Sequence, residues 1–296
     1  VRSRGLGDVY KRQGTSSGTT PPENSGPIPD PPLPHSSAMP HTDQIQALSE
    51  FLLEYATTLM GAGVHTNRAV RNISRIAAAY GYAADMTIFQ RNITMSLIST
   101  DDENLRRTSV RKLKPLAFNL NLIQQLSELS WLPVDNNVSI EEMERAFRSI
   151  AATKRFSPWT DLLLVSVGNA AFCRLFNGDI WAMLTVFGAT LLGFLAKQQF
   201  SRLKFNPLGV VILSAFTASM AAACAVIFQF GETPQIALAT SVLFLVPGVQ
   251  MINSIMDLMH GHILMGISRG VHSIMIITCI TIGLSATMLI LGVNSL

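Results

Sequence analysis

The chain has 296 residues, of which 48% are apolar and only 14% are charged, and its formal net charge is +3. This composition has too much apolar and too little charged surface for an ordinary soluble domain. The small net charge, without a basic tract that alternates with aromatic residues, argues against a nucleic-acid partner. Charged residues are frequent before about residue 155 and scarce after it. We therefore expect a soluble domain followed by a membrane domain.

Residues 1–40 do not resemble a folded segment. The opening run VRSRGLGDVYKRQ is similar to translated sequencing-adaptor sequence, and the remainder is rich in proline, serine, threonine and glycine. Such a composition buries too little apolar surface to offset the entropy lost on folding. We expect a disordered or non-native tail here, without a part in the function.

Residues 41–156 are predicted to form a small α+β domain that begins with two helices. In the first helix, apolar residues recur at helical spacing from residue 42 until Gly61 and Gly63 interrupt the pattern. The second helix, over residues 66–80, would carry Arg68 and two further arginines on the face opposite its apolar side. This basic face is either solvated, or it docks to anionic headgroups, to a carboxylate substrate or to the membrane domain.

The remainder of this domain is predicted to mix strands and helices. Apolar and polar residues alternate over 86–98, which predicts a strand within a hairpin that turns near residues 90–92. A helix is expected over residues 113–131, and Ser139 with Glu142 forms a capping box that opens another. We find no phosphate-loop, dinucleotide-binding, zinc-protease or serine-hydrolase motif. The sequence therefore predicts no catalytic residues, no cofactor and no enzymatic activity.

Five apolar segments follow residue 156, and each is long enough to cross about 30 Å of hydrocarbon. Positive charges lie before the first segment, between the second and third at residues 197–204, and before the fifth at Arg269. Because such charges favour the cytoplasmic side, the N-terminal domain should be cytoplasmic and the C-terminus outside. The expected fold is an all-α bundle of five transmembrane helices over residues 157–296, preceded by the α+β domain. The expected spans are residues 159–176, 180–198, 207–230, 235–258 and 271–292.

The fourth predicted span departs most from a plain membrane helix. Pro247 lacks a backbone donor, and Gly248 beside it loosens the helix further, so a break is expected there. Gln250, Asn253 and Asp257 follow at spacings that place them on one helix face. A carboxylate at the bilayer centre costs roughly 3 kcal/mol, so Asp257 should face a cavity or a partner. It either takes part in solute or proton coupling or simply marks the water boundary.

Two polar residues in the other spans have open interpretations. Asp179 lies at a short outer turn, where it is either the N-cap of the second span or part of an outer vestibule. Asn169 lies within the first span, where its amide either joins helices or contacts a solute.

A metal site is not expected. His260 and His262 are two residues apart and would point away from each other on a helix, and no cluster of cysteines or carboxylates completes a site. The three cysteines lie far apart within apolar segments, so no disulfide is predicted. Gly266 and Gly270 form a small-xxx-small pair, for which close helix packing is the expected use.

Three segments, at residues 59–82, 172–179 and 245–270, together resemble the threonine/serine exporter family, and the similarity extends over about residues 48–296. Three motifs of this family have the forms AGA-x-T-x-RV, LFGGD and LVPG-x-x-x-x-N-x-x-x-D-x-x-x-G. The residues that match them are Gly61, Gly63, Arg68, Leu175, Phe176, Gly178, Asp179, Pro247, Gly248, Asn253, Asp257 and Gly261. Asn177 replaces a usual glycine.

The resemblance implies secondary transport without an ATP-hydrolysing part. Members of this family are exporters of small amino acids or, in split two-subunit forms, of dicarboxylates such as succinate. Fused members continue into a second set of helices, whereas this chain ends after one set. The resemblance therefore implies an N-terminal-half subunit resembling the larger subunit of split exporters, located in a bacterial inner membrane.

The leading hypothesis is export of a small polar metabolite, either threonine and serine or a short dicarboxylate. Asp257 would bind an ammonium group or a proton, and a carboxylate substrate would need positive partners, for which Arg174 and Arg269 are the candidates. An odd number of spans favours a second small multi-span subunit, a homo-oligomer, or both, besides the lipid bilayer. The alternative is a non-transporting scaffold or regulatory subunit whose cytoplasmic domain binds a partner.

Overall fold

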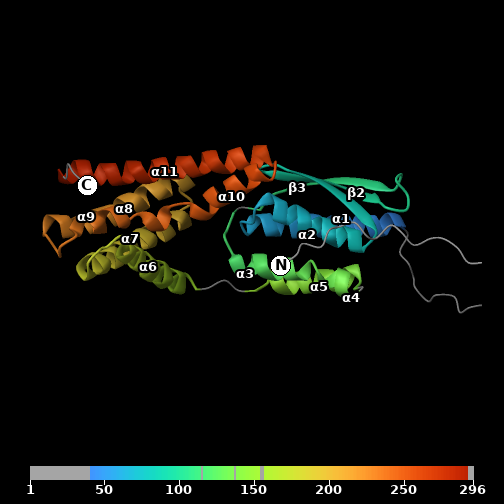
Figure 1. Cartoon of the computed structure of the whole chain (residues 1–296), viewed down its shortest axis with the longest axis horizontal. Coiled ribbons are helices and arrows are strands. Elements are labelled where there is room, and N and C mark those ends of the chain that lie inside the picture. The colour runs from blue at the N-terminus through green and yellow to red at the C-terminus, as the bar shows by residue number, and fades with distance from the viewer. Residues whose placement is uncertain (1–40, 115, 137, 154–156, 293–296) are drawn as a thin grey trace, which may run out of the picture. The chain divides into compact units, whose positions relative to one another are not determined.

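The computed structural model describes residues 41–114, 116–136, 138–153 and 157–292 (Figure 1). The expectation of a disordered or non-native tail over residues 1–40 lies outside these residues. Within them the fold is mostly helical, with a small sheet in the N-terminal part.

The N-terminal part contains five helices and three strands among its described residues. Its first helix, α1, buries the predicted apolar stripe completely at Leu48, Leu52, Tyr55 and Leu59. The predicted capping box at Ser139 is present and opens α5. The elements are α1 (His41–Gly61), α2 (Thr66–Ala79), β1 (Tyr82–Ile88), β2 (Asn92–Ser99), β3 (Arg106–Lys112), α3 (Leu120–Leu129), α4 (Leu132–Asn136) and α5 (Ile140–Ala151).

The sheet is antiparallel, in the order β1-β2-β3. The predicted hairpin joins β1 to β2, and the amide of Phe89 donates to the carbonyl of Asn92 at 2.9 Å. Ile93, Met95 and Leu97 of β2 alternate toward the core and are fully buried. The third strand was not predicted, because its sequence RRTSVRK has no alternating apolar face.

The helix predicted over residues 113–131 begins only at Leu120, so the first part of that prediction is wrong. Asn119 caps α3 by accepting a hydrogen bond from the amide of Leu122. The amides of Ala117 and Asn119 donate at 2.8 and 3.1 Å to the carbonyls of Gly61 and Ala62 at the end of α1. Tertiary hydrogen bonds therefore replace the helical bonds that this segment would otherwise make.

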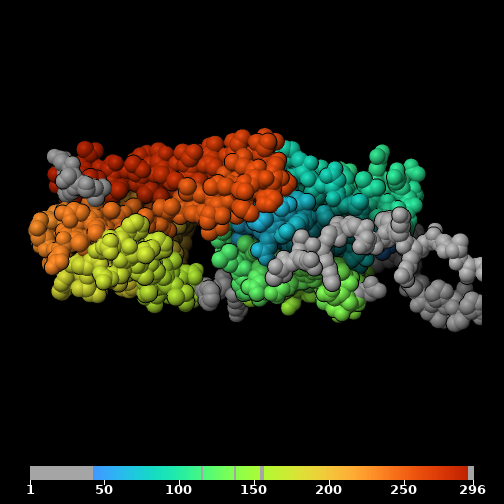
Figure 2. All heavy atoms as spheres, in the orientation of Figure 1, coloured from blue at the N-terminus to red at the C-terminus, as the bar shows by residue number. Residues whose placement is uncertain are grey.

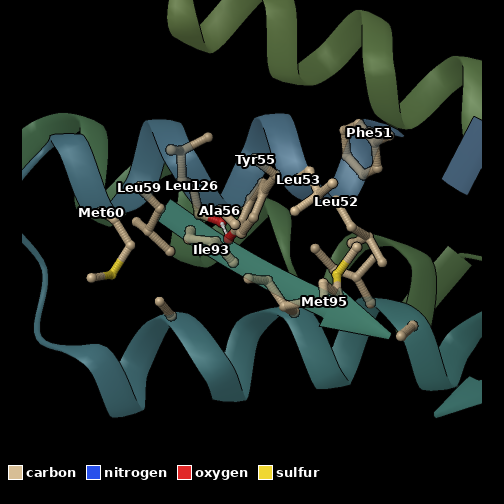
Figure 3. Packing of buried hydrophobic residues seen from close by; sticks show 14 of the residues in the cluster. Phe51, Leu52, Leu53, Tyr55, Ala56, Leu59, Met60, Ile93, Met95 and Leu126 are labelled. Carbon is tan, nitrogen blue, oxygen red and sulfur yellow. Dashed lines mark hydrogen bonds between the residues drawn. The ribbon is translucent and has the colours of Figure 1, made fainter. Parts of the chain in front are cut away.

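The core of the N-terminal part is organised around Tyr55 of α1 (Figure 3). Its hydroxyl donates to the carbonyl of Leu126 at 2.6 Å and accepts from the amide of Asn72 at 3.2 Å. Burial raises the pKa of Tyr55 well above its usual value, so the hydroxyl stays protonated. Arg68 donates to Ser127 at 3.1 Å, and Arg75 lies 3.6 Å from the ring centre of Trp131. Much of the basic face of α2 thus docks to α3 and the residues after it.

The C-terminal part is a helical bundle. Among the described residues, α7, α8 and α11 are long and apolar enough to cross a membrane, and the bent pair formed by α9–η1 and α10 would make a fourth span. The predicted count of five spans is not confirmed, because α6 does not meet the same criterion. The elements are α6 (Pro158–Leu175), α7 (Ile180–Arg202), α8 (Pro207–Ile227), α9 (Pro234–Thr240), the 3₁₀ turn η1 (Leu243–Leu245), α10 (Gly248–Met259) and α11 (Ile263–Leu291).

Small residues bring the membrane helices close together. A Cβ atom added at Gly283 of α11 would lie 2.6 Å from the carbonyl of Ile212 in α8. The hydroxyls of Ser219 and Thr287 hydrogen-bond across the same two helices at 2.6 Å. Such packing is the usual way for membrane helices to associate, because lipid gives them no hydrophobic driving force.

Candidate functional site at the broken helix

The fourth predicted span is interrupted where the sequence indicates. Its two halves, Pro234–Leu245 and Gly248–Met259, are bent by 58°. The first half is itself irregular, because α9 ends at Thr240 and the 3₁₀ turn η1 follows it. The carbonyl of Thr240 accepts a hydrogen bond from the buried side-chain amide of Asn169 at 3.2 Å. The same amide group donates to Thr190 of α7 at 2.7 Å. Asn169 therefore joins α6, α7 and α9, and these contacts support the joining interpretation.

Beyond the break, α10 turns its polar face toward the N-terminal part. Asn253 and Asp257 are buried, whereas Gln250 is partly exposed. The amide of Asn253 donates to the carbonyl of Gly63 at 2.7 Å. The carboxylate of Asp257 accepts at 2.7 Å from the backbone amide of Thr66, the first residue of α2. A helix N-terminus carries partial positive charge and favours such a carboxylate.

Arg269 of α11 completes this arrangement. Its Nη1 atom lies 3.0 Å from the Oδ2 atom of Asp257, and its Nη2 atom donates to the carbonyl of Val64 at 2.9 Å. The contact with Asp257 is an ion pair without the alignment of a hydrogen bond. Asp257 is 0% and Arg269 15% exposed in their side chains. A carboxylate this deeply buried requires a charged partner, and Arg269 supplies it.

The loop between α1 and α2, residues 62–65, is shaped to receive these side chains. Gly63 has a φ of +94°, and a Cβ atom there would overlap the ring of Phe118, so only glycine fits. His65 caps α2, and its ring stacks on that of His260 at 6.0 Å between centres. Burial lowers the pKa of His65, although the nearby carboxylate of Asp257 opposes that shift.

The turn from α10 to α11 holds the two charged residues in register. Ser254 donates to the carbonyl of Gly266 at 2.7 Å, and a Cβ atom at Gly266 would lie 2.6 Å from Leu258. A Cβ atom at Gly270 would lie 3.0 Å from the hydroxyl of Ser254. The expected use of this glycine pair in close helix packing is therefore confirmed.

Asp179 and Arg174 lie elsewhere. Asp179 caps α7 by accepting from the amide of Ala182 at 2.9 Å, and it also accepts from the amide of Glu232 at 3.0 Å. These backbone hydrogen bonds lower the pKa of Asp179. Arg174 donates to the carbonyl of Gly178 at 3.2 Å. The two residues therefore fasten the turn between α6 and α7, which lies at the opposite end of the bundle from the turn between α10 and α11 (Figure 1).

The structure thus brings together Gly63, Gln250, Asn253, Asp257 and Arg269 among the predicted site residues. Gly61 contributes a carbonyl to the neighbouring segment, while Pro247 and Gly248 lie at the break itself. In the region that the structure describes, no three His, Cys, Asp or Glu side chains converge as a metal site would require. The atoms of α10 and the start of α11, orange in Figure 2, lie directly beside those of the N-terminal part.

A cavity of about 730 Å³ opens at this junction. Gln250, Asn253, Arg269 and His272 line it from the membrane helices. Its other wall comes from the hairpin turn, the end of β3 and the segment after it, and includes Arg91, Lys112 and Lys114. Sequence reasoning missed these three cations, because no motif or periodic pattern connects them to the broken helix.

Residues 50–291 match the family described as "Putative threonine/serine exporter". The chain is 26% identical over 246 residues to the "Probable succinate transporter subunit YjjP" of Klebsiella aerogenes, an alignment that covers 82% of this chain and 94% of that protein. It is 27% identical over 231 residues to the protein of the same name in Escherichia coli K12, covering 77% of this chain and 88% of that protein. No solved structure matches the chain. The family match extends over most of the sequence, and the chain therefore belongs to the threonine/serine exporter family.

Proposed function

We propose that this chain is one subunit of a secondary transporter that exports a small polar metabolite across a bacterial inner membrane. Membership of an exporter family supports transport by a multi-pass membrane protein. The observation that carries the specific proposal is Asp257, which is fully buried in a broken helix and held by residues on both sides of the junction. Half-helix ends of this kind hold ions and substrates in many transporters.

In this proposal the contacts of Asp257 form a closure on the cytoplasmic side. The carboxylate holds α10 to α2 through Thr66 and to α11 through Arg269. Neutralising the carboxylate, by a proton or by an ammonium group of the solute, would weaken the attraction to Arg269 and to the N-terminus of α2. The bent half-helix would then be free to move and open a path along its polar face.

The solute is either an amino acid such as threonine or serine, or a short dicarboxylate. The family description names the first, and the two relatives are named for succinate. Both relatives are called subunits, which supports assembly with a second subunit. In this proposal that subunit is smaller and also crosses the membrane several times. We place the N-terminal part in the cytoplasm, because the positively charged loops between the helices should lie on the same side of the membrane as that part, and such loops favour the cytoplasmic side.

The test is efflux from proteoliposomes that contain the full chain, with and without a co-expressed small multi-span subunit, preloaded with labelled threonine or succinate. Asp257→Asn keeps the shape and the acceptor for Thr66 but removes the charge, and we expect it to abolish most efflux. Asp161→Asn is the matched control, since Asp161 lies in the first turn of α6 and, among the described residues, its side chain makes no hydrogen bond or ion pair with α2, α10 or α11. Efflux that survives Asp257→Asn would refute the role of Asp257. Stable assembly without efflux of either solute would instead favour a scaffold subunit.

A further inference from the structure

We propose that the cavity at the junction is a cytoplasmic binding site for a short dicarboxylate, with one carboxylate at Arg269 and the other at Arg91 and Lys112. This inference rests on the proposed transport function, selects the dicarboxylate from the two solute classes named there, and adds the place where the solute first binds. The site is distinct from the buried carboxylate of Asp257, which does not line the cavity.

The charge of the cavity favours an anion. Four of its described lining residues are cationic, namely Arg91, Lys112, Lys114 and Arg269, and none of those described is acidic. The ammonium of Lys114 donates to Thr58 at 2.8 Å. Arg91 and Lys112 are exposed, and in the described part of the chain their side chains have no hydrogen-bond or ion-pair partner. Their charges are therefore available to a ligand.

The cations lie on two walls. Arg91 and Lys112 are neighbours, because the amide of Leu113 donates to the carbonyl of Arg91 at 2.8 Å and Lys112 pairs with Asn92 in the sheet. The other wall includes Arg269 of α11 together with Gln250 and Asn253 of α10. The lining also includes the apolar side chains of Met60, Phe118 and Met265. A dicarboxylate matches this arrangement, since it has two anionic ends and a short apolar middle.

A zwitterionic amino acid fits less well. Its carboxylate would find a guanidinium, but its ammonium would meet no acidic side chain among the described lining residues and would lie near several cations. The volume of about 730 Å³ is ample for a four-carbon diacid with bridging water and falls within the usual range of small-molecule sites.

Binding in the cavity should be coupled to the proposed closure at Asp257, because Arg269 takes part in both. A carboxylate in the cavity would compete with Asp257 for the same guanidinium. Binding should then loosen the hold of Arg269 on Asp257 and on the carbonyl of Val64. The reverse must hold as well, because coupling between two sites is reciprocal.

The test is isothermal titration of the purified full chain in detergent, at low ionic strength, with succinate and with threonine. We expect succinate to bind and threonine to bind at least about tenfold more weakly. The double variant Arg91→Gln/Lys112→Gln should weaken succinate binding by about tenfold or more, whereas Arg202→Gln/Lys204→Gln, at the end of α7, should leave it unchanged. Asp257→Asn should tighten succinate binding, because it removes the competitor for Arg269.

The proposal would be overturned by the absence of succinate binding at millimolar concentration, by binding that the Arg91/Lys112 variant does not weaken, or by equal binding of threonine. Displacement of succinate by phosphatidylglycerol, with tighter binding of that lipid, would assign the cations to a lipid headgroup instead. Efflux measured on the same variants separates this inference from the proposed function. Efflux that depends on Asp257 but not on Arg91 and Lys112 would leave transport standing and remove only this site.

Discussion

The ion pair between Asp257 and Arg269 allows a quantitative test of the junction. Arg269→Gln removes the guanidinium but leaves Asp257 fully buried, and among the described residues the backbone amide of Thr66 is then the donor that its carboxylate keeps. Removing one member of a buried ion pair typically costs about 3 to 5 kcal/mol, because the other charge stays desolvated. At about 3 kcal/mol, the contact between α10 and α2 should open on the order of 100-fold more often.

Amide hydrogen exchange, followed by mass spectrometry on the full chain in detergent, measures this opening directly. Protection should fall at the first turn of α2 and around residue 64, while the core of β2 keeps its protection. The double variant Asp257→Asn/Arg269→Gln should recover most of the loss, since no uncompensated charge then remains buried. Unchanged protection at α2 in the single variant, or no recovery in the double variant, would refute the reasoning.

Of three further predictions, two concern the junction and one concerns the helix bundle. Gly63→Ala should destabilise the junction by about 2 kcal/mol, because alanine disfavours a positive φ and its Cβ would displace Phe118. Urea-dependent proteolysis of the full chain measures this loss of stability. Because the pKa of His65 is lowered in the folded protein, the unfolded state binds the proton more readily. The contribution of neutral His65 to the stability of the junction is therefore complete above the ordinary pKa of 6.5 and is lost as the pH falls below it. Amide exchange at α2 between pH 5 and 8 should show this trend, and His65→Gln should reduce it. Asn169→Leu should leave the carbonyl of Thr240 without its side-chain donor. The free energy of unfolding of the bundle should then fall by about 1 to 3 kcal/mol, which thermal unfolding measures.

Each of these has a contradicting outcome. Gly168, where an added Cβ would meet nothing within 4 Å, is the matched control for alanine substitution, and an equal loss at both glycines would contradict the loop argument. A junction that becomes more protected as the pH falls would reverse the sign assigned to His65. Undiminished stability of Asn169→Leu would show that the helix bundle does not depend on that amide.

The predictions made from local patterns succeeded where neighbouring residues determine the structure. The period of apolar residues indicated α1, and the capping box at Ser139 indicated the start of α5. The proline and glycine at 247 and 248 indicated the break, because a missing donor and a missing Cβ act within one helical turn. The helix expected from residue 113 and the unpredicted strand β3 were errors of one kind. In both segments hydrogen bonds to distant backbone outweigh local preference.

The sequence by itself determined that a polar, interrupted helix carries a carboxylate that needs a partner. Only the tertiary structure decided which partner it has. Thr66 is 191 residues from Asp257 in the chain, and their hydrogen bond has no counterpart in any local spacing. The same holds for Arg91 and Lys112. In the sequence they are indistinguishable from solvated charges at the end of a strand, and only the tertiary structure shows that they line a cavity with Arg269 of α11. The energy of a buried charge depends on everything within a few ångströms of it, and only the packed chain specifies those neighbours.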